Sequence, residues 1–310
     1  MYYFIVNPNS RSGAGQKVWD LLKKELELRQ TDYTVFMTKY AGHAVQLSKK
    51  ISGEASLEKP VYIVAVGGDG TIQEVLTGII AFEHVVFGYI PIGSGNDFCR
   101  GMGLPRTPIK ALDVILSQNR IVRMDVPVIQ EGKRISRFGV STGIGFDAAV
   151  CRDVGITPLK KYLNRLHLGK LVYLLVALKQ LLFTAPCSMS ISMDGGRIQQ
   201  YEKVYFITVM NQKYEGGGFC FCPNASPFDG FLDVLVVEGF HKLRLLICLP
   251  AALWGRHTHF KGIHIFRCRH IDIHSEASLP VHKDGEARNM EREFSVSLMK
   301  KTLKVILPVI

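Results

Sequence analysis

The chain has 310 residues, of which 47% are hydrophobic and 21% are charged, and its formal net charge is +11. This composition excludes a disordered chain, and the length allows one large or two ordinary domains, each with a buried core. The positive charge indicates an anionic partner such as a nucleotide, a nucleic acid or an acidic membrane surface.

The cellular setting is predicted from signals that the sequence lacks. No basic segment precedes an apolar run at the start, so we expect no secretory signal. The longest strongly apolar run, residues 171–178, is too short to span a bilayer. Seven scattered cysteines are typical of reduced thiols in a cytoplasm. No neighbouring motif completes a metal site around Cys220/Cys222 or His257/His259, and we interpret these histidines as surface residues.

The first part of the chain, to about residue 123, alternates predicted strands and helices. Short apolar runs predict strands at residues 3–6, 33–37, 61–66 and 85–90. Apolar periodicity predicts helices at residues 17–29, about 44–50, 71–82 and 108–116. This alternation favours a doubly wound parallel sheet whose ligand-binding loops follow the carboxyl ends of the strands.

A glycine-rich loop, Val-Gly-Gly-Asp-Gly-Thr at residues 66–71, follows the third of these strands. A glycine turn between a strand and a helix directs bare N–H groups and the positive helix end at one point, which predicts a phosphate site. Asp69 would repel phosphate unless it met a metal ion or a ribose hydroxyl. The alternative is a plain strand–turn–helix with an Asx turn.

Five further motifs accompany this loop, and together they carry a family resemblance. Residues 7–15 (Asn-Pro-Asn-Ser-Arg-Ser-Gly-Ala-Gly) and 90–98 (Ile-Pro-Ile-Gly-Ser-Gly-Asn-Asp-Phe) also follow predicted strands. The others are Gly-Ile-Gly-Phe-Asp-Ala at residues 143–148, Phe-Asp-Gly-Phe-Leu-Asp at 228–233 and Asp-Gly-Glu at 284–286. Over nearly its whole length, the chain resembles the diacylglycerol kinase catalytic family, which includes bacterial lipid kinases and is related to sphingosine and ceramide kinases.

Beyond about residue 123, short alternating runs predict a second, mostly antiparallel domain. They lie at residues 126–140, 187–193, 203–210, 232–238, 262–274 and 294–298. The resemblance implies a β-sandwich here, with a last strand at residues 303–307 returning to the first domain. We expect an α/β fold with an N-terminal doubly wound parallel α/β domain (residues 1–123, completed by 299–310) and a C-terminal antiparallel β-sandwich domain (residues 124–298) for the lipid substrate.

One segment, residues 157–185, breaks the β pattern because it is rich in leucine and carries several basic residues. It predicts one or two amphipathic helices. These helices cover a face of the sheet, contact a membrane, or do both.

The resemblance implies that ATP is bound at the carboxyl ends of the strands in the first domain. Arg11 is a phosphate contact or a solvated side chain, and Ser94 stands where the family often has threonine. The expected nucleotide-binding residues are Asn7, Pro8, Asn9, Ser10, Arg11, Thr38, Gly67, Gly68, Asp69, Gly70, Thr71, Glu74, Ser94, Asn96 and Asp97.

Phosphoryl transfer also needs neutralised phosphate charge and a base for the incoming hydroxyl. Asp69 is the first candidate to hold Mg²⁺. The resemblance implies that Glu286 is the base and that Asp284 orients it or polarises the hydroxyl; the alternative is a solvent-exposed hairpin tip. It also implies a second Mg²⁺ site made by Asp229 with the carbonyls of Ser226 and Phe231, for which the alternative is a tight turn.

These expectations describe an ATP- and Mg²⁺-dependent lipid kinase, with diacylglycerol as the first substrate considered. We expect a cytoplasmic protein at the inner face of the membrane, whose partners are its lipid substrate and an anionic membrane surface. No nucleic-acid partner is expected, and a homodimer is left open. The alternatives are an ATP–NAD kinase-like enzyme and a non-catalytic nucleotide- or lipid-binding regulator.

Overall fold

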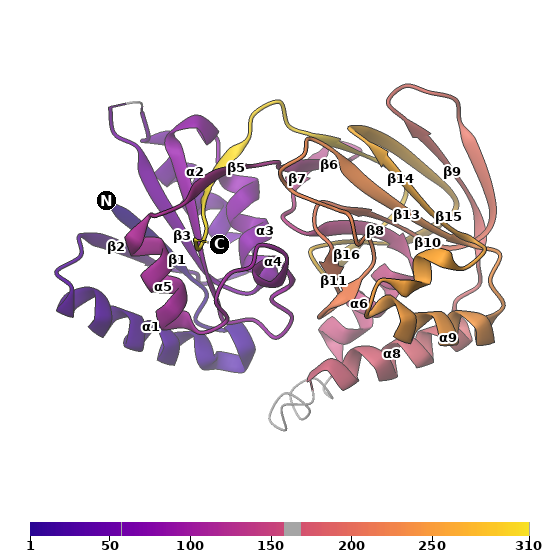
Figure 1. Cartoon of the computed structure of the whole chain (residues 1–310), viewed down its shortest axis with the longest axis horizontal. Coiled ribbons are helices and arrows are strands. Elements are labelled where there is room, and N and C mark those ends of the chain that lie inside the picture. The colour runs from indigo at the N-terminus through magenta and orange to yellow at the C-terminus, as the bar shows by residue number, and fades with distance from the viewer. Residues whose placement is uncertain (57, 158–168, 310) are drawn as a thin grey trace. The chain divides into compact units, whose positions relative to one another are not determined.

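The computed structural model describes residues 1–56, 58–157 and 169–309. It divides the chain into two compact units, which are described separately below (Figure 1). Unit 1 comprises Met1–Val126 and Lys300–Ile310, and unit 2 comprises Pro127–Met299. The sequence placed these boundaries at residues 123/124 and 298/299.

Unit 1 contains a six-stranded sheet in the order β2–β1–β3–β4–β17–β5. All neighbouring strands are parallel except β17 and β5, which are antiparallel. The last strand therefore completes the first sheet, as the resemblance implies. The strands are β1 (Tyr2–Val6), β2 (Tyr33–Met37), β3 (Val61–Gly67), β4 (Val85–Pro91), β5 (Ile121–Met124) and β17 (Leu303–Ile306).

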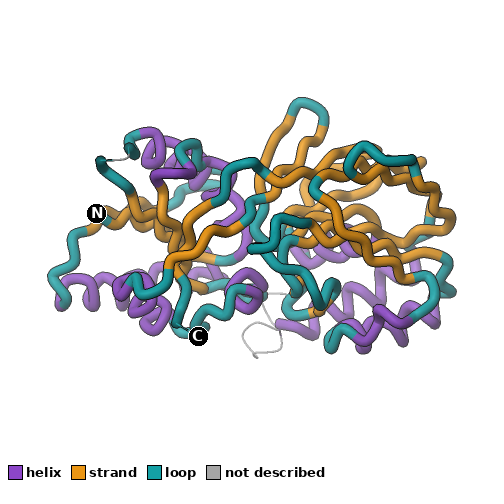
Figure 2. The backbone as a smooth tube through the Cα atoms, turned by 45° about the horizontal axis from the view of Figure 1, so that its top comes forward, coloured by secondary structure: helices purple, strands orange, loops and turns teal. Residues whose placement is uncertain are grey.

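Helices cover both faces of this sheet (Figure 2). The buried residues Trp19, Leu22 and Leu26 recur at helical spacing and pack on one face, where α5 also packs. On the other face, α2 and α3 lie against each other. The helices are α1 (Ser10–Leu28), α2 (His43–Gly53), α3 (Asp69–Gly78), the 3₁₀ turn η1 (Phe82–His84), α4 (Asp97–Gly101) and α5 (Pro108–Ser117).

Helices α1 and α3 in unit 1 differ most from their predicted bounds. Helix α1 begins at Ser10 rather than near residue 17, although its first turns are irregular because Arg11 and Gly13 have φ angles of +49° and +94°. Helix α3 spans Asp69–Gly78 instead of residues 71–82, since the backbone is already extended at Ile79. The glycine loop therefore leads directly into the first turn of α3.

Unit 2 contains a nine-stranded antiparallel sheet in the order β14–β13–β10–β8–β15–β16–β6–β7. Strand β9 pairs with the first part of β10 and of β15, and β8 pairs with the last part of both, so β8 and β9 lie end to end between them. The strands are β6 (Pro127–Glu131), β7 (Arg134–Arg137), β8 (Ser141–Gly145), β9 (Cys187–Met193), β10 (Gln199–Met210), β13 (Leu232–Glu238), β14 (Ile263–Cys268), β15 (His270–Lys283) and β16 (Glu286–Leu298), beside a small hairpin of β11 (Tyr214–Glu215) and β12 (Phe219–Cys220).

Helices of unit 2 share one apolar cluster with residues of its sheet, including Phe206 and Leu235. They are α6 (Phe146–Ile156), α8 (Gly169–Phe183), α9 (Lys242–Ala252) and the 3₁₀ turn η2 (Arg256–His259). The structure confirms a helix within the predicted segment 157–185, of which residues 158–168 lie outside the described part. The sequence missed α6 and α9, because short apolar runs do not separate helix from strand. Among the described helices, none combines the length and apolar character needed to cross a bilayer.

Candidate active site

Four adjacent parallel strands bring the predicted nucleotide-binding loops to one edge of unit 1. Asn7 follows β1 and donates its backbone N–H to Val66 at 2.9 Å, while Thr38 follows β2 and donates to Val6 at 2.8 Å. After β4, the N–H of Ile92 lies 2.7 Å from the carbonyl of Gly67. The segments that the sequence singled out therefore form one connected set of loops.

The glycine loop after β3 is packed too closely for larger residues. A Cβ on Gly67 would lie 2.3 Å from Oγ1 of Thr71, and a Cβ on Gly93 would lie 2.8 Å from Cα of Gly68. Gly68 is the N-cap of α3, and its carbonyl accepts the N–H groups of Thr71 at 2.9 Å and of Ile72 at 3.2 Å. The positive end of α3 therefore lies at the loop, as an anion site requires.

Asp69 links the loop after β3 to the loop after β4. Its two carboxylate oxygens accept the backbone N–H groups of Asp97 and Phe98, both at 3.2 Å. Carboxylate oxygens are ligands that suit Mg²⁺. The residues present therefore fit a magnesium ion at Asp69, in addition to a structural role that the sequence did not indicate.

Other predicted nucleotide-binding residues are engaged within unit 1. The carboxylate of Glu74 accepts the N–H groups of Gly42 at 2.7 Å and Ala44 at 3.3 Å, at the start of α2. The amide of Asn7 donates to Oγ1 of Thr71 at 3.4 Å. Glu74 thus stabilises α2, and its contact with a nucleotide stays a prediction. Among the remaining predicted residues, Asn9, Arg11 and Ser94 are exposed, whereas Ser10 and Asp97 are buried.

The Asp-Gly-Glu motif forms the tight turn between β15 and β16. Asp284 and Gly285 have φ angles of +47° and +82°, and Lys283 pairs with Glu286 across the turn. Two positive φ angles are typical of a type I′ hairpin turn, for which Asp-Gly is a preferred sequence. Glu286 is the exposed first residue of β16. The hairpin tip that we considered as an alternative therefore exists, and it carries the predicted base.

Asp284 is buried and anchors this turn. Its Oδ2 accepts the N–H of Gly139 at 2.7 Å, and its Oδ1 accepts those of Val140 at 2.8 Å and Ser141 at 3.0 Å. Burial raises the pKa of Asp284 to about 6, although the three N–H donors act in the opposite direction. Of the two roles predicted for Asp284, this geometry favours orienting Glu286 over contacting a lipid hydroxyl.

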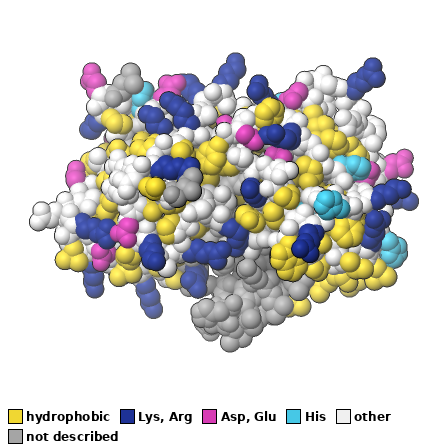
Figure 3. Space-filling view, viewed as in Figure 1, with side chains coloured by type: hydrophobic (Ala, Val, Ile, Leu, Met, Phe, Trp, Pro, Cys, Tyr) yellow, Lys and Arg dark blue, Asp and Glu magenta, His cyan; other side chains and the backbone are white. Residues whose placement is uncertain are grey.

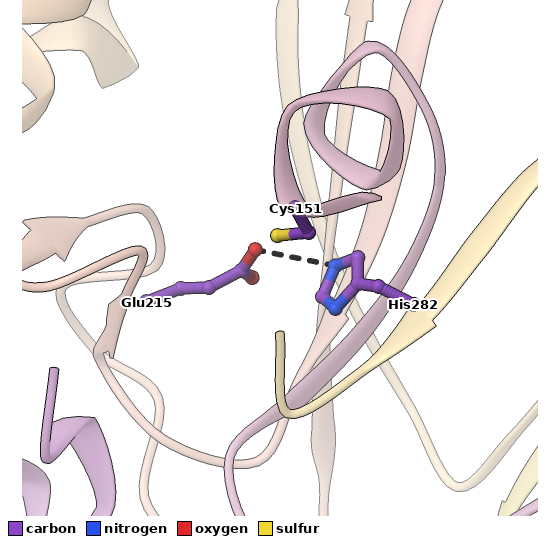
Figure 4. A group of neighbouring side chains, drawn as sticks. All are labelled: Cys151, Glu215 and His282. Atoms are coloured by element: carbon purple, nitrogen blue, oxygen red, sulfur yellow. Dashed lines mark ion pairs between the residues drawn. The ribbon is translucent and has the colours of Figure 1, made fainter. Parts of the chain in front are cut away.

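A buried charged cluster contains His282, which lies two residues before Asp284, and it was not predicted from the sequence. Figure 4 shows His282 and its partner Glu215 next to Cys151. Nε2 of His282 lies 3.1 Å from Asp147 and 3.2 Å from Glu215. Burial alone lowers the pKa of His282, but Glu215 and Asp147 outweigh it and raise the value to about 10. Burial raises the pKa of Asp147 to about 6. Burial also raises the pKa of Glu215, but the charge of His282 reverses this into a net lowering.

Cys151 stands beside this cluster, and its sulfur lies within 4.8 Å of ligand atoms of Glu215 and His282. Such a group has the composition of a metal site. Because a protonated His282 pairs with both Asp147 and Glu215, we interpret these residues as an ion-paired cluster rather than a metal site. A cavity of about 50 Å³, lined mainly by apolar side chains from α6, α8, α9, β10 and the region of β12, reaches Asp147 and Glu215.

The other predicted metal residues in unit 2 form a different arrangement. Asp229 accepts the N–H of Phe231 at 3.1 Å in an Asx turn, and its second oxygen pairs with Arg267. A guanidinium therefore supplies the positive charge that we expected from the second Mg²⁺, so the donors, including the carbonyl of Ser226, do not fit that ion in this conformation. This favours the tight-turn interpretation.

The prediction that His257 is a surface residue is wrong. Its side chain is buried, and its Nε2 lies 3.0 Å from the carbonyl of Phe221.

Two family descriptions match this chain. The diacylglycerol kinase catalytic domain matches residues 1–128, and the YegS C-terminal NAD kinase beta sandwich-like domain matches residues 140–307. These two matches correspond to the α/β unit and to the antiparallel unit described above.

Individual proteins agree with these matches. The chain is 31% identical over 297 residues to YtlR of Bacillus subtilis (strain 168), named as a candidate lipid kinase, covering 92% of this chain and 93% of that protein. It is 27% identical over 309 residues to the diacylglycerol kinase of the same strain, covering 98% and 95%. A crystal structure of a diacylglycerol kinase from Bacillus anthracis str. Sterne has a TM-score of 0.70 at 20% identity, covering 99% and 96%, which supports the fold. The chain belongs to the family of diacylglycerol and lipid kinases, which confirms the resemblance carried by its motifs.

Proposed function

We propose that this protein is an ATP-dependent lipid kinase that phosphorylates the hydroxyl of diacylglycerol to form phosphatidic acid. Family membership supports the kinase class. The observation that carries the proposal is the glycine loop at the positive end of α3, tied to the next loop by Asp69. Such a loop provides N–H donors for phosphate oxygens without a P-loop lysine.

In this proposal, unit 1 binds ATP. The first amides of α3 bind phosphate oxygens, and the polar side chains after β1, β2 and β4 add hydrogen bonds. Mg²⁺ held by Asp69 would neutralise phosphate charge, as kinases generally require.

Unit 2 supplies the base. The hydroxyl oxygen of the lipid forms a bond to the γ-phosphorus of ATP, and Glu286 accepts the proton of that hydroxyl. At the same time the bond between the γ-phosphorus and the bridging oxygen breaks, and ADP leaves. A base must be held in a defined direction to act in line. The type I′ turn and the three hydrogen bonds to Asp284 support this role, because they restrict how Glu286 can move.

We also propose that the protein works at the inner face of the membrane, since a diacylglycerol resides in a bilayer. The net charge of +11 supports an anionic surface as the partner.

The function can be tested with purified full-length protein, a total lipid extract, labelled ATP, Mg²⁺ and NAD in one mixture. We expect labelled phosphatidic acid as the main product, identified by mass spectrometry. A different labelled lipid would support the lipid kinase activity but replace diacylglycerol as the substrate. Labelled NADP would favour the NAD kinase-like alternative, and ATP binding without a labelled product would favour a regulator.

A further inference from the structure

Helix α9 is apolar on two opposite sides, and among the residues that the structure describes only one of these sides is covered. Leu245, Cys248 and Leu249 are buried in the cluster beneath the helix. Leu243 and Ile247 point the other way, and their exposed fractions are 67% and 66%. An apolar helix surface that meets no other part of its own fold indicates an interaction site.

Neighbouring residues extend this exposed surface beyond α9. Leu182 and Phe183, at the end of α8, are 70% and 76% exposed, and Trp254, just after α9, is 71% exposed. The two helices are joined where Nζ of Lys242 donates to the carbonyl of Leu182 at 2.6 Å. We call this surface the α8–α9 patch, and it consists of Leu182, Phe183, Leu243, Ile247 and Trp254.

Figure 3 shows hydrophobic side chains gathered along the lower edge of unit 2, where α8 and α9 lie in Figure 1. Large exposed apolar side chains that occur singly need no explanation, but four on two adjacent helices, with a fifth just after α9, are unusual for a surface in water.

The charged residues on and next to α9 have one sign. Residues 240–261 contain Lys242, Arg244, Arg256 and Lys261 and no aspartate or glutamate. Arg244 lies 5.0 Å from the centre of the Phe240 ring, at the base of α9. A basic margin around an apolar surface matches an anionic bilayer, in which the apolar side chains enter the acyl boundary and the basic ones meet the headgroups.

Two features favour a bilayer over a second copy of the chain. In a symmetric dimer the same patch faces itself, so its basic residues would be brought together and would repel each other. Tryptophan is also enriched at the membrane–water boundary, where its ring is apolar and its N–H meets water.

We propose that the α8–α9 patch is the surface by which this protein binds an anionic bilayer. The inference deepens the membrane part of the proposed function. It does not depend on the identity of the phosphorylated lipid or on catalysis by Glu286.

The chain contains a built-in reporter for this contact, because it has only two tryptophans. Trp19 is 3% exposed in the core of unit 1, whereas Trp254 lies in the patch. With vesicles of phosphatidylcholine and phosphatidylglycerol, we expect the fluorescence of Trp254 to shift to shorter wavelength and to be quenched by brominated lipid. Phosphatidylcholine alone should bind more weakly, and binding to the mixed vesicles should weaken as salt rises. If the protein sedimented with the vesicles while the fluorescence of Trp254 stayed unchanged, the contact would lie elsewhere and the proposal would be overturned.

A double variant tests the patch directly. Leu243→Ser with Ile247→Ser should weaken binding to the mixed vesicles by about tenfold or more, because both apolar side chains are lost from the acyl boundary. The matched control is Leu28→Ser with Ile198→Ser, which removes two residues that are 78% and 68% exposed outside the patch. Equal binding by the two double variants would overturn the proposal. The proposal would also be overturned if the wild type formed a dimer without vesicles and the patch variant were a monomer.

Activity separates this proposal from the proposed function. The patch variant should phosphorylate a dispersed short-chain diacylglycerol at the wild-type rate and lose turnover only on vesicles. If the wild type fails on the dispersed lipid but still requires the patch for vesicle binding, the kinase proposal fails and the patch proposal stands. An equal loss on both forms of the lipid would mean that the patch variant damages the enzyme itself, and the assignment of the patch to the bilayer would then be rejected.

Discussion

Nε2 of His282 lies 3.1 Å from Oδ2 of Asp147, and both side chains are buried in unit 2. His282 lies near the end of β15, two residues before Asp284, so one member of the buried cluster directly precedes the turn that leads to Glu286. The exposed Glu286, which is the proposed base, is therefore only four residues from the buried charge of His282.

The cluster predicts a pH dependence of stability. The pKa of His282 is raised from 6.5 to about 10, so its stabilisation is fully present below pH 6.5 and is lost as the pH rises through about 10. Between these values the free energy of unfolding should fall with pH, by at most about 1.4 kcal/mol per pH unit from this group. Urea unfolding of the wild type and of His282→Gln from pH 7 to 10 measures the difference. If the free energy of unfolding changed equally with pH in the two proteins, His282 would be neutral in the folded protein.

Asp284→Asn should destabilise unit 2 and reduce turnover without changing ATP affinity. An asparagine amide directs N–H groups at the backbone donors of residues 139–141, and one unsatisfied buried donor costs about 1–3 kcal/mol. Thermal unfolding, calorimetry with ATP and lipid phosphorylation measure the three quantities. Asp272→Asn is the control, since that side chain lies on the same strand and is 59% exposed. A variant that is as stable as the control would contradict the anchoring role.

Glu286→Gln should reduce turnover about 10²–10⁴-fold, the usual range for loss of a general base. The substitution keeps the size of the side chain and removes its basic oxygen, so ATP affinity by calorimetry should stay the same. Glu293→Gln, on the same strand and 81% exposed, should be fully active. Unchanged turnover would move the base to Asp284 or Asp97, and lost ATP binding would make Glu286 a nucleotide-site residue.

Asp69→Asn should lower turnover about 10²-fold or more, because it removes a charge expected to hold Mg²⁺ near the phosphates. Asparagine keeps one acceptor oxygen for the N–H groups of Asp97 and Phe98, so the loops should stay in place better than with alanine. The exposed Asp113→Asn on α5 is the control. Turnover above about a tenth of the wild-type value, at an unchanged unfolding temperature, would exclude a metal role for Asp69.

The sequence predicted unit 1 well because its strands are short, β-branched runs bounded by glycine and proline. Strand β2 was predicted at its observed bounds, and the loops after β1, β3 and β4 were predicted at the sheet edge where they lie. The sequence failed where an apolar run was too short to show its period, as in α9. The sequence also did not indicate the structural role of Asp69, because its hydrogen bonds to Asp97 and Phe98 depend on how two separate loops pack.

The cluster in unit 2 shows why part of the site could not be predicted. Asp147 and His282 are separated by 135 positions in the chain and become neighbours only because β8 pairs with β15. By contrast, the turn at Asp284 could be read from the sequence, because Asp-Gly adopts positive φ angles for local steric reasons. Likewise, Arg267 reaches Asp229 only through the pairing of β13 with β14.

The position of β17 has a consequence for synthesis on the ribosome. This strand fills the gap between β4 and β5, yet it is translated after all of unit 2. Until then, the nascent α/β unit exposes an unpaired strand edge at β4, next to the segment that leads into Ser94 and Asn96, and open edges invite aggregation. The amino-terminal unit therefore begins to fold first and finishes last, so the proposed nucleotide binding should appear only after β17 has been synthesised and has paired with β4 and β5.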